Sequence, residues 1–162
     1  MLSFILPILC GALFLVADQI SKAYFVANFT LGETSEFIPG FIDFVYIHNT
    51  GSAWGMFSGK RIFLVIVSIA IMGVCIGVLI KLKKSNMLMS WSIVLVLSGG
   101  IGNLIDRIFR EGKVIDFLHF EFWPEFPVFN IADCAVVIGG GLLILSYIVD
   151  IVKESNKKNA KN

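Results

Sequence analysis

The stretch IFLVIVSIAIMGVCIGVLI at residues 62–80 decides the class of this protein, because it carries no charge and is long enough to cross a bilayer as a helix. A hydrocarbon core of about 30 Å needs roughly 20 helical residues. Three further apolar stretches of similar length lie at about residues 2–24, 88–106 and 131–152. The sequence therefore predicts an all-α membrane protein, a bundle of four transmembrane helices in one integral membrane domain covering residues 1–162.

The composition agrees with a membrane protein. Of the 162 residues, 57% are hydrophobic and 15% are charged, and the mean hydropathy is +0.86, far from the values of soluble domains. The net charge of +1 gives no broad basic field, so we expect no nucleic-acid partner. Cys10, Cys75 and Cys134 are interpreted as small buried hydrophobic residues rather than as a disulfide framework.

The segment LPILC at residues 6–10 superficially looks like a lipoprotein cleavage box. No Lys or Arg precedes this apolar run, and the bulky Leu9 stands where a cleavable site requires a small residue. We therefore interpret the first run as a retained transmembrane helix.

Basic residues indicate how the helices are oriented. Lys81, Lys83 and Lys84 crowd the short second connection, and a Lys-rich tail at residues 153–162 follows the fourth helix. Because cytoplasmic loops carry an excess of Lys and Arg, we expect both termini and this connection in the cytoplasm. The longer connections, at about residues 25–61 and 107–130, then lie on the outer face.

These outer connections carry two further patterns. From Thr34 to Phe57 apolar and polar residues alternate around the turn signal Pro39-Gly40, which predicts two short strands in a small extracytoplasmic β element. Between Val114 and Phe129 the chain is rich in aromatic residues, which predicts an interfacial aromatic loop at headgroup level: Phe117, Phe120, Phe122, Trp123, Phe126 and Phe129.

The predicted topology also brings a set of polar and small residues to the outer membrane face. An ionisable group at a bilayer boundary is costly, so a functional role is the default expectation. The set consists of Asp18, Lys22, Asn49, Gly51, Asn103, Asp106, Arg107, Asp116, Asn130 and Asp133.

Several of these residues also have purely structural explanations. Asp18 and Lys22 have the spacing of a helix salt bridge, and Asn130 with Asp133 fits a helix N-cap with an acidic third position. The third helix places Gly99, Asn103, Asp106 and Arg107 near one face, where a hydrogen-bonded packing seam is the alternative to a functional site. Asp116 has no comparable local explanation.

Two carboxylates on one side of a membrane can hydrolyse a peptide bond with water, because one accepts a proton while the other donates one. Asp116 and Asp133, which bracket the aromatic loop, are the candidates for this pair. His48 and His119 have no partners at ligand spacing, so we expect neither a metal site nor another cofactor. The residues thus favour an intramembrane aspartyl peptidase.

Five motifs in order along the chain give this interpretation a family. The set resembles the bacterial lipoprotein signal peptidase (signal peptidase II) family. It comprises Asp18-Gln19-Ile20-Ser21-Lys22, Asn49-Thr50-Gly51-Ser52-Ala53-Trp54-Gly55, Gly99-Gly100-Ile101-Gly102-Asn103-Leu104-Ile105-Asp106-Arg107, Val114-Ile115-Asp116-Phe117 and Phe129-Asn130-Ile131-Ala132-Asp133.

The resemblance implies a four-helix aspartic peptidase of the bacterial cytoplasmic membrane with its site toward the outer face. It implies cleavage of diacylglyceryl-modified prolipoproteins before the lipidated cysteine, contact with membrane lipids, and inhibition by the cyclic peptide globomycin. By position it assigns the catalytic dyad to Asp116 and Asp133. It assigns substrate-binding or supporting roles to Asp18, Lys22, Asn49, Gly51, Asn103, Asp106, Arg107, Asn130 and Ala132.

Two carboxylates a few ångströms apart should share one proton near neutral pH. The sequence leaves open which Asp is protonated, although the dipole of the fourth helix favours an ionised Asp133. One alternative is a small transporter or channel in which Asp18, Asp106 and Asp133 relay ions, and this predicts polar residues at mid-bilayer depth. Another is a non-enzymatic scaffold, which leaves the paired carboxylates unexplained.

Overall fold

The computed structural model describes residues 2–81 and 87–159, so Lys83, Lys84 and Lys161 lie outside the described residues. In chain order, the elements are α1 (Leu2–Asn28), β1 (Thr34–Ile38), β2 (Ile42–Asn49), a short 3-10 turn (Ala53–Gly55), α2 (Arg61–Lys81), α3 (Met87–Phe109), β3 (Val114–Phe120) and α4 (Ile131–Asn159). Within the described ranges, four helices have the length and apolar character needed to cross a membrane. The predicted bundle is confirmed. Each helix extends beyond its predicted limits, and α4 does so most, because it continues to Asn159 through most of the stretch predicted as a tail at residues 153–162.

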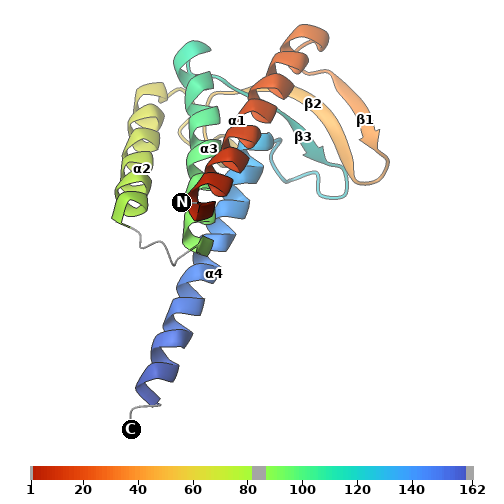
Figure 1. The fold of residues 1–162 in the computed structure, drawn as a ribbon. Coiled ribbons are helices and arrows are strands. Elements are labelled where there is room, and N and C mark those ends of the chain that lie inside the picture. The colour runs from red at the N-terminus through yellow and green to blue at the C-terminus, as the bar shows by residue number, and fades with distance from the viewer. Residues whose placement is uncertain (1, 82–86, 160–162) are drawn as a thin grey trace.

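Helix α3 lies at the centre of the bundle and packs against α1, α2 and α4 (Figure 1). Its contact with α4 is the closest because glycines replace side chains where the helices cross. A Cβ placed on Gly99 would collide with the Ala132 carbonyl, and one on Gly139 would lie 2.7 Å from the Ser92 carbonyl oxygen. By contrast, a Cβ on Gly73 or Gly77 in α2 would meet nothing within 4 Å. Gly73 and Gly77, whose spacing is that of a small-xxx-small packing pattern, therefore contact no other helix among the described residues.

The β element is a three-stranded antiparallel sheet in the order β1-β2-β3. The sequence predicts β1 and β2 but not β3, which pairs with β2 from Ile42 opposite Phe120 to Asn49 opposite Val114. Four consecutive residues of β3, from Val114 to Phe117, are buried. A strand covered on both faces lacks the alternation of apolar and polar residues that reveals half-buried strands, and this explains why the pattern misses it.

A small aromatic core fastens the sheet to the end of α1. Phe117 stacks on Phe25 with ring centroids 4.3 Å apart, and both pack with Tyr46 and Ile115. Phe117 is thus a core residue, and its assignment to an interfacial aromatic belt is wrong. The following aromatic residues form a continuous chain of ring contacts at the edge of the sheet: Phe120, Phe122, Trp123, Phe126 and Phe129.

The sheet, the ends of α1 and α3, and the starts of α2 and α4 gather at one end of the bundle (Figure 1). The C-terminal part of α4 projects beyond the other helices at the opposite end (Figure 1). The polar motifs therefore meet at a single end, as the four-helix topology requires.

Candidate active site

The N-terminus of α4 is held by a reciprocal cap. The Asp133 backbone N–H donates to Asn130 Oδ1 (2.9 Å), and the Asn130 backbone N–H donates to Asp133 Oδ2 (3.1 Å). The next free N–H, that of Ala132, donates across the bundle to Asp18 Oδ1 (2.9 Å). The predicted N-cap is thus present, and it fixes the Asp133 carboxyl at the start of the helix.

Asp116 lies in the middle of the buried part of β3. Its Oδ2 accepts a bond from Asn49 Nδ2 at the end of β2 (2.9 Å), and its Oδ1 accepts one from Asn130 Nδ2 (2.6 Å). Asn130 therefore bonds both candidate carboxyls. The remaining oxygen, Asp133 Oδ1, accepts a bond from Asn103 Nδ2 (2.7 Å). All four oxygens of the pair thus face neutral amide donors.

Burial sets the protonation of Asp116, whose side chain is 1% exposed. Removal from water, followed by the nearby charge of Asp133, raises the pKa of Asp116 to about 7, although the bonds from Asn49 and Asn130 oppose this shift. Near neutral pH this carboxyl therefore holds a proton for a large part of the time. A buried carboxylic acid beside a second carboxyl is the arrangement that acid–base catalysis requires.

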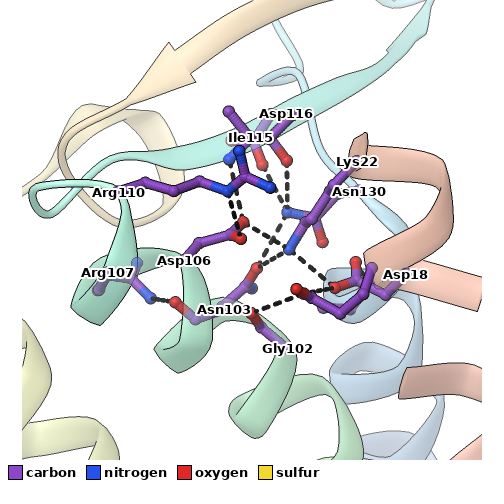
Figure 2. Close-up of polar contacts among 12 residues, drawn as sticks. Asp18, Lys22, Gly102, Asn103, Asp106, Arg107, Arg110, Ile115, Asp116 and Asn130 are labelled. Atoms are coloured by element: carbon purple, nitrogen blue, oxygen red, sulfur yellow. Dashed lines mark hydrogen bonds and ion pairs between the residues drawn. The ribbon is translucent and has the colours of Figure 1, made fainter. Parts of the chain in front are cut away.

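An ion network with a buried centre, formed by Asp18, Lys22 and Asp106, lies beside Asp116 (Figure 2). Lys22 Nζ lies 2.9 Å from Asp18 Oδ2 and 2.9 Å from Asp106 Oδ2, and it donates to Asn103 Oδ1 (2.9 Å). Asp106 also accepts bonds from Arg110 Nε (3.1 Å) and from the Ile115 N–H (3.2 Å). The predicted salt bridge of α1 is therefore real, but it is part of a network that joins α1, α3 and β3.

Arg107 connects α3 to the first outer connection. Its Nη2 donates to the Gly51 carbonyl (3.0 Å) and its Nη1 to the Asn103 carbonyl (3.3 Å). Gly51 is needed there, because a Cβ would lie 2.6 Å from the Met56 carbonyl oxygen. The Nε of Arg107 is buried and has no partner among the described residues. A buried donor left without a partner is costly, so the fold holds this side chain in place at an energetic cost.

The two carboxyls open into a cleft of about 510 Å³ between the sheet, α3 and α4. Asn49, Asn103 and Arg107 line it together with them, and the rest of its surface is mainly apolar: Ser52, Ala53, Trp54, Val114, Phe126, Pro127, Val128, Phe129, Val136 and Val137. The rings of Trp54 and Phe126 contact each other at 6.0 Å. Among residues 2–81 and 87–159, the structure contains no group of three or more His, Cys, Asp or Glu suited to a metal ion.

The structure thus brings every predicted site residue into one region, in different roles. Ala132 serves packing, since a Cβ on Gly102 would lie 3.1 Å from the Ala132 Cβ. The sequence interpretation omits Val136 and Val137 from the site, although their spacing of three and four residues from Asp133 predicts the same helix face. Trp54, which also lines the cleft, is omitted as well, and no local sequence pattern indicates its left-handed backbone (φ 55°).

The two histidines do not line the cleft. His48 bonds Tyr46 Oη (2.8 Å), and His119 bonds the Pro124 carbonyl (3.4 Å).

Comparisons with known proteins give matches over most of the chain. The family described as Signal peptidase (SPase) II matches residues 10–149. The chain is 42% identical to the lipoprotein signal peptidase of Enterococcus faecalis over 154 residues, which cover 95% of this chain and 92% of that protein. It is 37% identical to the lipoprotein signal peptidase of Staphylococcus aureus, with coverage of 94% and 91%.

Solved structures give the same answer at the level of the fold. A bacterial membrane enzyme determined at 2.3 Å resolution superposes with a TM-score of 0.84 and is 34% identical, covering 90% of this chain and 88% of that one. A second bacterial membrane enzyme, at 1.9 Å resolution, gives a TM-score of 0.79 with 34% identity and coverage of 87% and 91%.

Proposed function

This chain belongs to the signal peptidase II family, and from that premise we propose that it removes signal peptides from diacylglyceryl-modified prolipoproteins by cutting before the lipidated cysteine. The observation that carries the proposal is a pair of carboxyls, the buried Asp116 and the half-buried Asp133, joined through Asn130 at the mouth of an apolar cleft. The family accounts for the lipoprotein substrate, and the pair supplies an aspartyl mechanism.

In this mechanism a water molecule lies between the two carboxyls. Asp133 accepts a proton from the water as it attacks the scissile carbonyl, while protonated Asp116 transfers its proton to the carbonyl oxygen, which gives the gem-diol intermediate. In the collapse Asp133 gives its proton to the leaving nitrogen, and Asp116 takes a proton back from a hydroxyl of the gem-diol. The raised pKa of Asp116 and the helix N-terminus at Asp133 both support this division of roles.

The supporting residues hold the pair and the substrate backbone. Asn49, Asn103 and Asn130 each donate to a carboxyl oxygen and so restrict its rotation. Arg107 lines the cleft, and its guanidinium can donate to a carbonyl oxygen of the substrate. These contacts would align the scissile bond with the water.

The apolar lining of the cleft fits a substrate that is itself a membrane helix with acyl chains. Val136 and Val137 line it from α4, and Trp54 with Phe126 lines it from the outer connections. We place the protein in the bacterial cytoplasmic membrane, with both termini in the cytoplasm and the dyad near the outer face. This is the side on which an exported precursor presents its lipidated cysteine.

An ion relay through Asp18 and Asp106 has less support. Both carboxylates are ion-paired with Lys22 and lie in one cluster with Asp116 (Figure 2). A transporter needs titratable groups spaced through the membrane, whereas this network is confined to one end of the bundle.

The decisive experiment is incubation of the purified protein with a diacylglyceryl-modified prolipoprotein, with the cut located by mass spectrometry. We expect a single cut before the modified cysteine, much slower cleavage of the unmodified precursor, and inhibition by globomycin. The Asp116→Asn variant is the matched control for contaminating proteases. Equal cleavage of both precursors, or full activity of the control, would reject the proposal.

The orientation has its own test. In a background without native cysteines, a cysteine introduced at Gly40 should react with a membrane-impermeant thiol reagent in intact cells, whereas one introduced at Lys83 should not. The reverse labelling pattern would put the dyad on the side away from the exported substrate.

A further inference from the structure

We propose that Lys22 is a positioning residue that fixes the amide orientation of Asn103, so that Asn103 presents its nitrogen and not its oxygen to Asp133. The inference rests on the proposed function, since its effect is on the dyad. It assigns Lys22 a role beyond the salt bridge that its spacing in α1 predicts.

The first step concerns the bonds of Lys22 itself. An ammonium has three N–H donors and no acceptor, and Lys22 spends its donors on Asp18, Asp106 and Asn103, each at 2.9 Å. The two carboxylates already offset the cost of burying the charge. The third bond, from Lys22 to Asn103, is therefore not needed for charge balance. Its effect is on the orientation of the Asn103 side chain.

The second step concerns Asn103, whose amide could sit in two orientations related by a half turn. In the observed orientation Oδ1 accepts from Lys22 and from Asn130 Nδ2 (3.1 Å), and Nδ2 donates to Asp133 (2.7 Å). The other orientation would face NH₂ toward an ammonium and an oxygen toward a carboxylate. Lys22 opposes it strongly because an ammonium can only donate.

The third step asks whether Asn130 alone could fix Asn103. The Nδ2 of Asn130 has two hydrogens but three acceptors within reach: Asp116 Oδ1 at 2.6 Å, Asn103 Oδ1 at 3.1 Å and the Ile115 carbonyl at 3.3 Å. Its shortest bond goes to Asp116, so its bond to Asn103 is shared and weak. Lys22 is thus the donor that determines the orientation of Asn103.

The consequence reaches the dyad. With Nδ2 facing it, Asp133 is stabilised as a carboxylate and can act as the base. A reversed Asn103 would place an oxygen against that carboxyl and favour its protonated form, which would exchange the roles of Asp133 and Asp116. Other charged groups close to this region are Asp18, Asp106 and Arg107, and the test has to keep their net charge constant.

A charge-compensated pair of variants provides the test. Lys22→Met with Asp18→Asn removes one positive and one negative charge, so the pair has the net charge of the wild type, and the new Asn side chain can still accept the Ala132 N–H. We expect kcat on lipidated precursor to fall about 10- to 100-fold relative to the wild type and clearly below that of Asp18→Asn alone, with KM changed less than threefold, as for loss of a residue that orients a catalytic group. If this pair does not fold, Lys22→Met with Asp106→Asn, compared with the wild type and with Asp106→Asn alone, carries the same test.

A mutant cycle with Asn103→Leu separates positioning from general support. If Lys22 acts through Asn103, removing Lys22 in an Asn103→Leu background should lower kcat less than threefold further. Ser98→Ala is the structural control, because it breaks another buried bond between α3 and α1, from Ser98 Oγ to the Gly11 carbonyl (2.6 Å). It should lower the thermal midpoint and leave kcat unchanged.

The outcomes distinguish the two proposals. No cleavage of lipidated precursor by the wild-type protein would refute the proposed function. Normal wild-type cleavage with unchanged kcat in the compensated pair, or multiplicative effects of the Lys22 and Asn103 changes, would overturn the positioning role alone.

Discussion

Helices α2 and α3 are similar in length, 21 and 23 residues, yet they differ in hydropathy, in burial and in the polar residues they carry. Helix α2 is the more apolar of the two and buries one side chain, Leu64, whereas α3 buries serines, glycines, Asp106 and Arg107 among its ten buried residues. Asn103 and Arg107 of α3 also line the cleft, and no residue of α2 does so. The most apolar transmembrane helix therefore contributes least to the site.

The difference has a physical origin. A helix surrounded by lipid satisfies its environment with apolar side chains alone, whereas a helix surrounded by protein can carry polar residues if other helices supply their partners. In α3 those partners come from α1, β3 and α4, as the bonds of Asp106 and Asn103 show. Hydropathy thus identifies membrane helices, and departures from it identify where the chemistry is.

The largest expected effect tests the polar end directly. Asp116→Asn and Asp133→Asn keep size and much of the hydrogen bonding but remove proton exchange, so each should lower kcat by about a thousandfold or more. The double variant should be scarcely slower than either single one, because the two carboxyls act as a unit. Initial rates on lipidated precursor, with folding verified by thermal melts, measure this. Near-normal cleavage by both single variants would make the aspartyl mechanism wrong.

The second effect is a pH dependence of the protein's stability, which arises from Asp116 at the polar end and not from α2. Because the folded-state pKa of Asp116 is raised from 3.8 to about 7, the folded protein binds more protons than the unfolded chain between these values. Stability should therefore fall as pH rises through this window, by at most about 1.4 kcal/mol per pH unit, and level off above it.

The Asp116→Asn variant isolates this contribution. Relative to the wild type it should become progressively more stable as pH rises from 4 to 7, because it no longer requires a buried carboxyl to ionise. Thermal midpoints of both proteins across this range, in one detergent, measure the difference. A constant difference between them would mean that the pKa of Asp116 is not raised in the folded state.

A third, smaller effect concerns the packing of α3 against α1. The Cβ of a Gly102→Ala variant would lie 2.7 Å from Asp18 Oδ2, the oxygen that pairs with Lys22. We expect a loss of about 1 to 3 kcal/mol in stability, together with reduced activity. Gly100→Ala on the same helix is the control, since its Cβ would meet Met72 at an ordinary 3.6 Å. Equal melting of the two variants would show that α3 and α1 can separate without cost.

The comparison also explains what the sequence can and cannot predict. The spans follow from apolar runs, and the gathering of polar motifs at one end follows from an even number of crossings. Strand β3 is missed because burial on both faces removes its alternation. The capping bonds between Asn130 and Asp133 are predictable from spacing, but the bonds between residues far apart in the sequence are not. Nothing in local sequence indicates that Asp18 of α1 bonds the Ala132 N–H of α4.

The structural and the functional explanation of a motif are not mutually exclusive. Asp133 is both the acidic residue of a helix cap and a member of the dyad, and Lys22 is both a salt-bridge partner and a neighbour of Asn103. A structural bond restricts the rotation of a side chain, and a catalytic side chain needs that restriction. Sequence patterns identify the bond, and only the fold shows which bonds converge.

The smallest expected effect belongs to α2. In Gly73→Leu and Gly77→Leu the new Cβ meets nothing within 4 Å, and leucine favours helix over glycine, so stability should change by less than about 1 kcal/mol, toward greater stability. Activity should remain within twofold of wild type. Gly139→Leu in α4 is the matched contrast, because a Cβ there would already lie 2.7 Å from the Ser92 carbonyl oxygen. Thermal melts and cleavage rates of the three variants, at several protein concentrations in detergent, measure this.

A concentration-dependent loss of stability in the Gly73 or Gly77 variant would mean that this face of α2 packs against a second copy of the chain. Helix α2 would then have a packing role that its apolar sequence does not indicate.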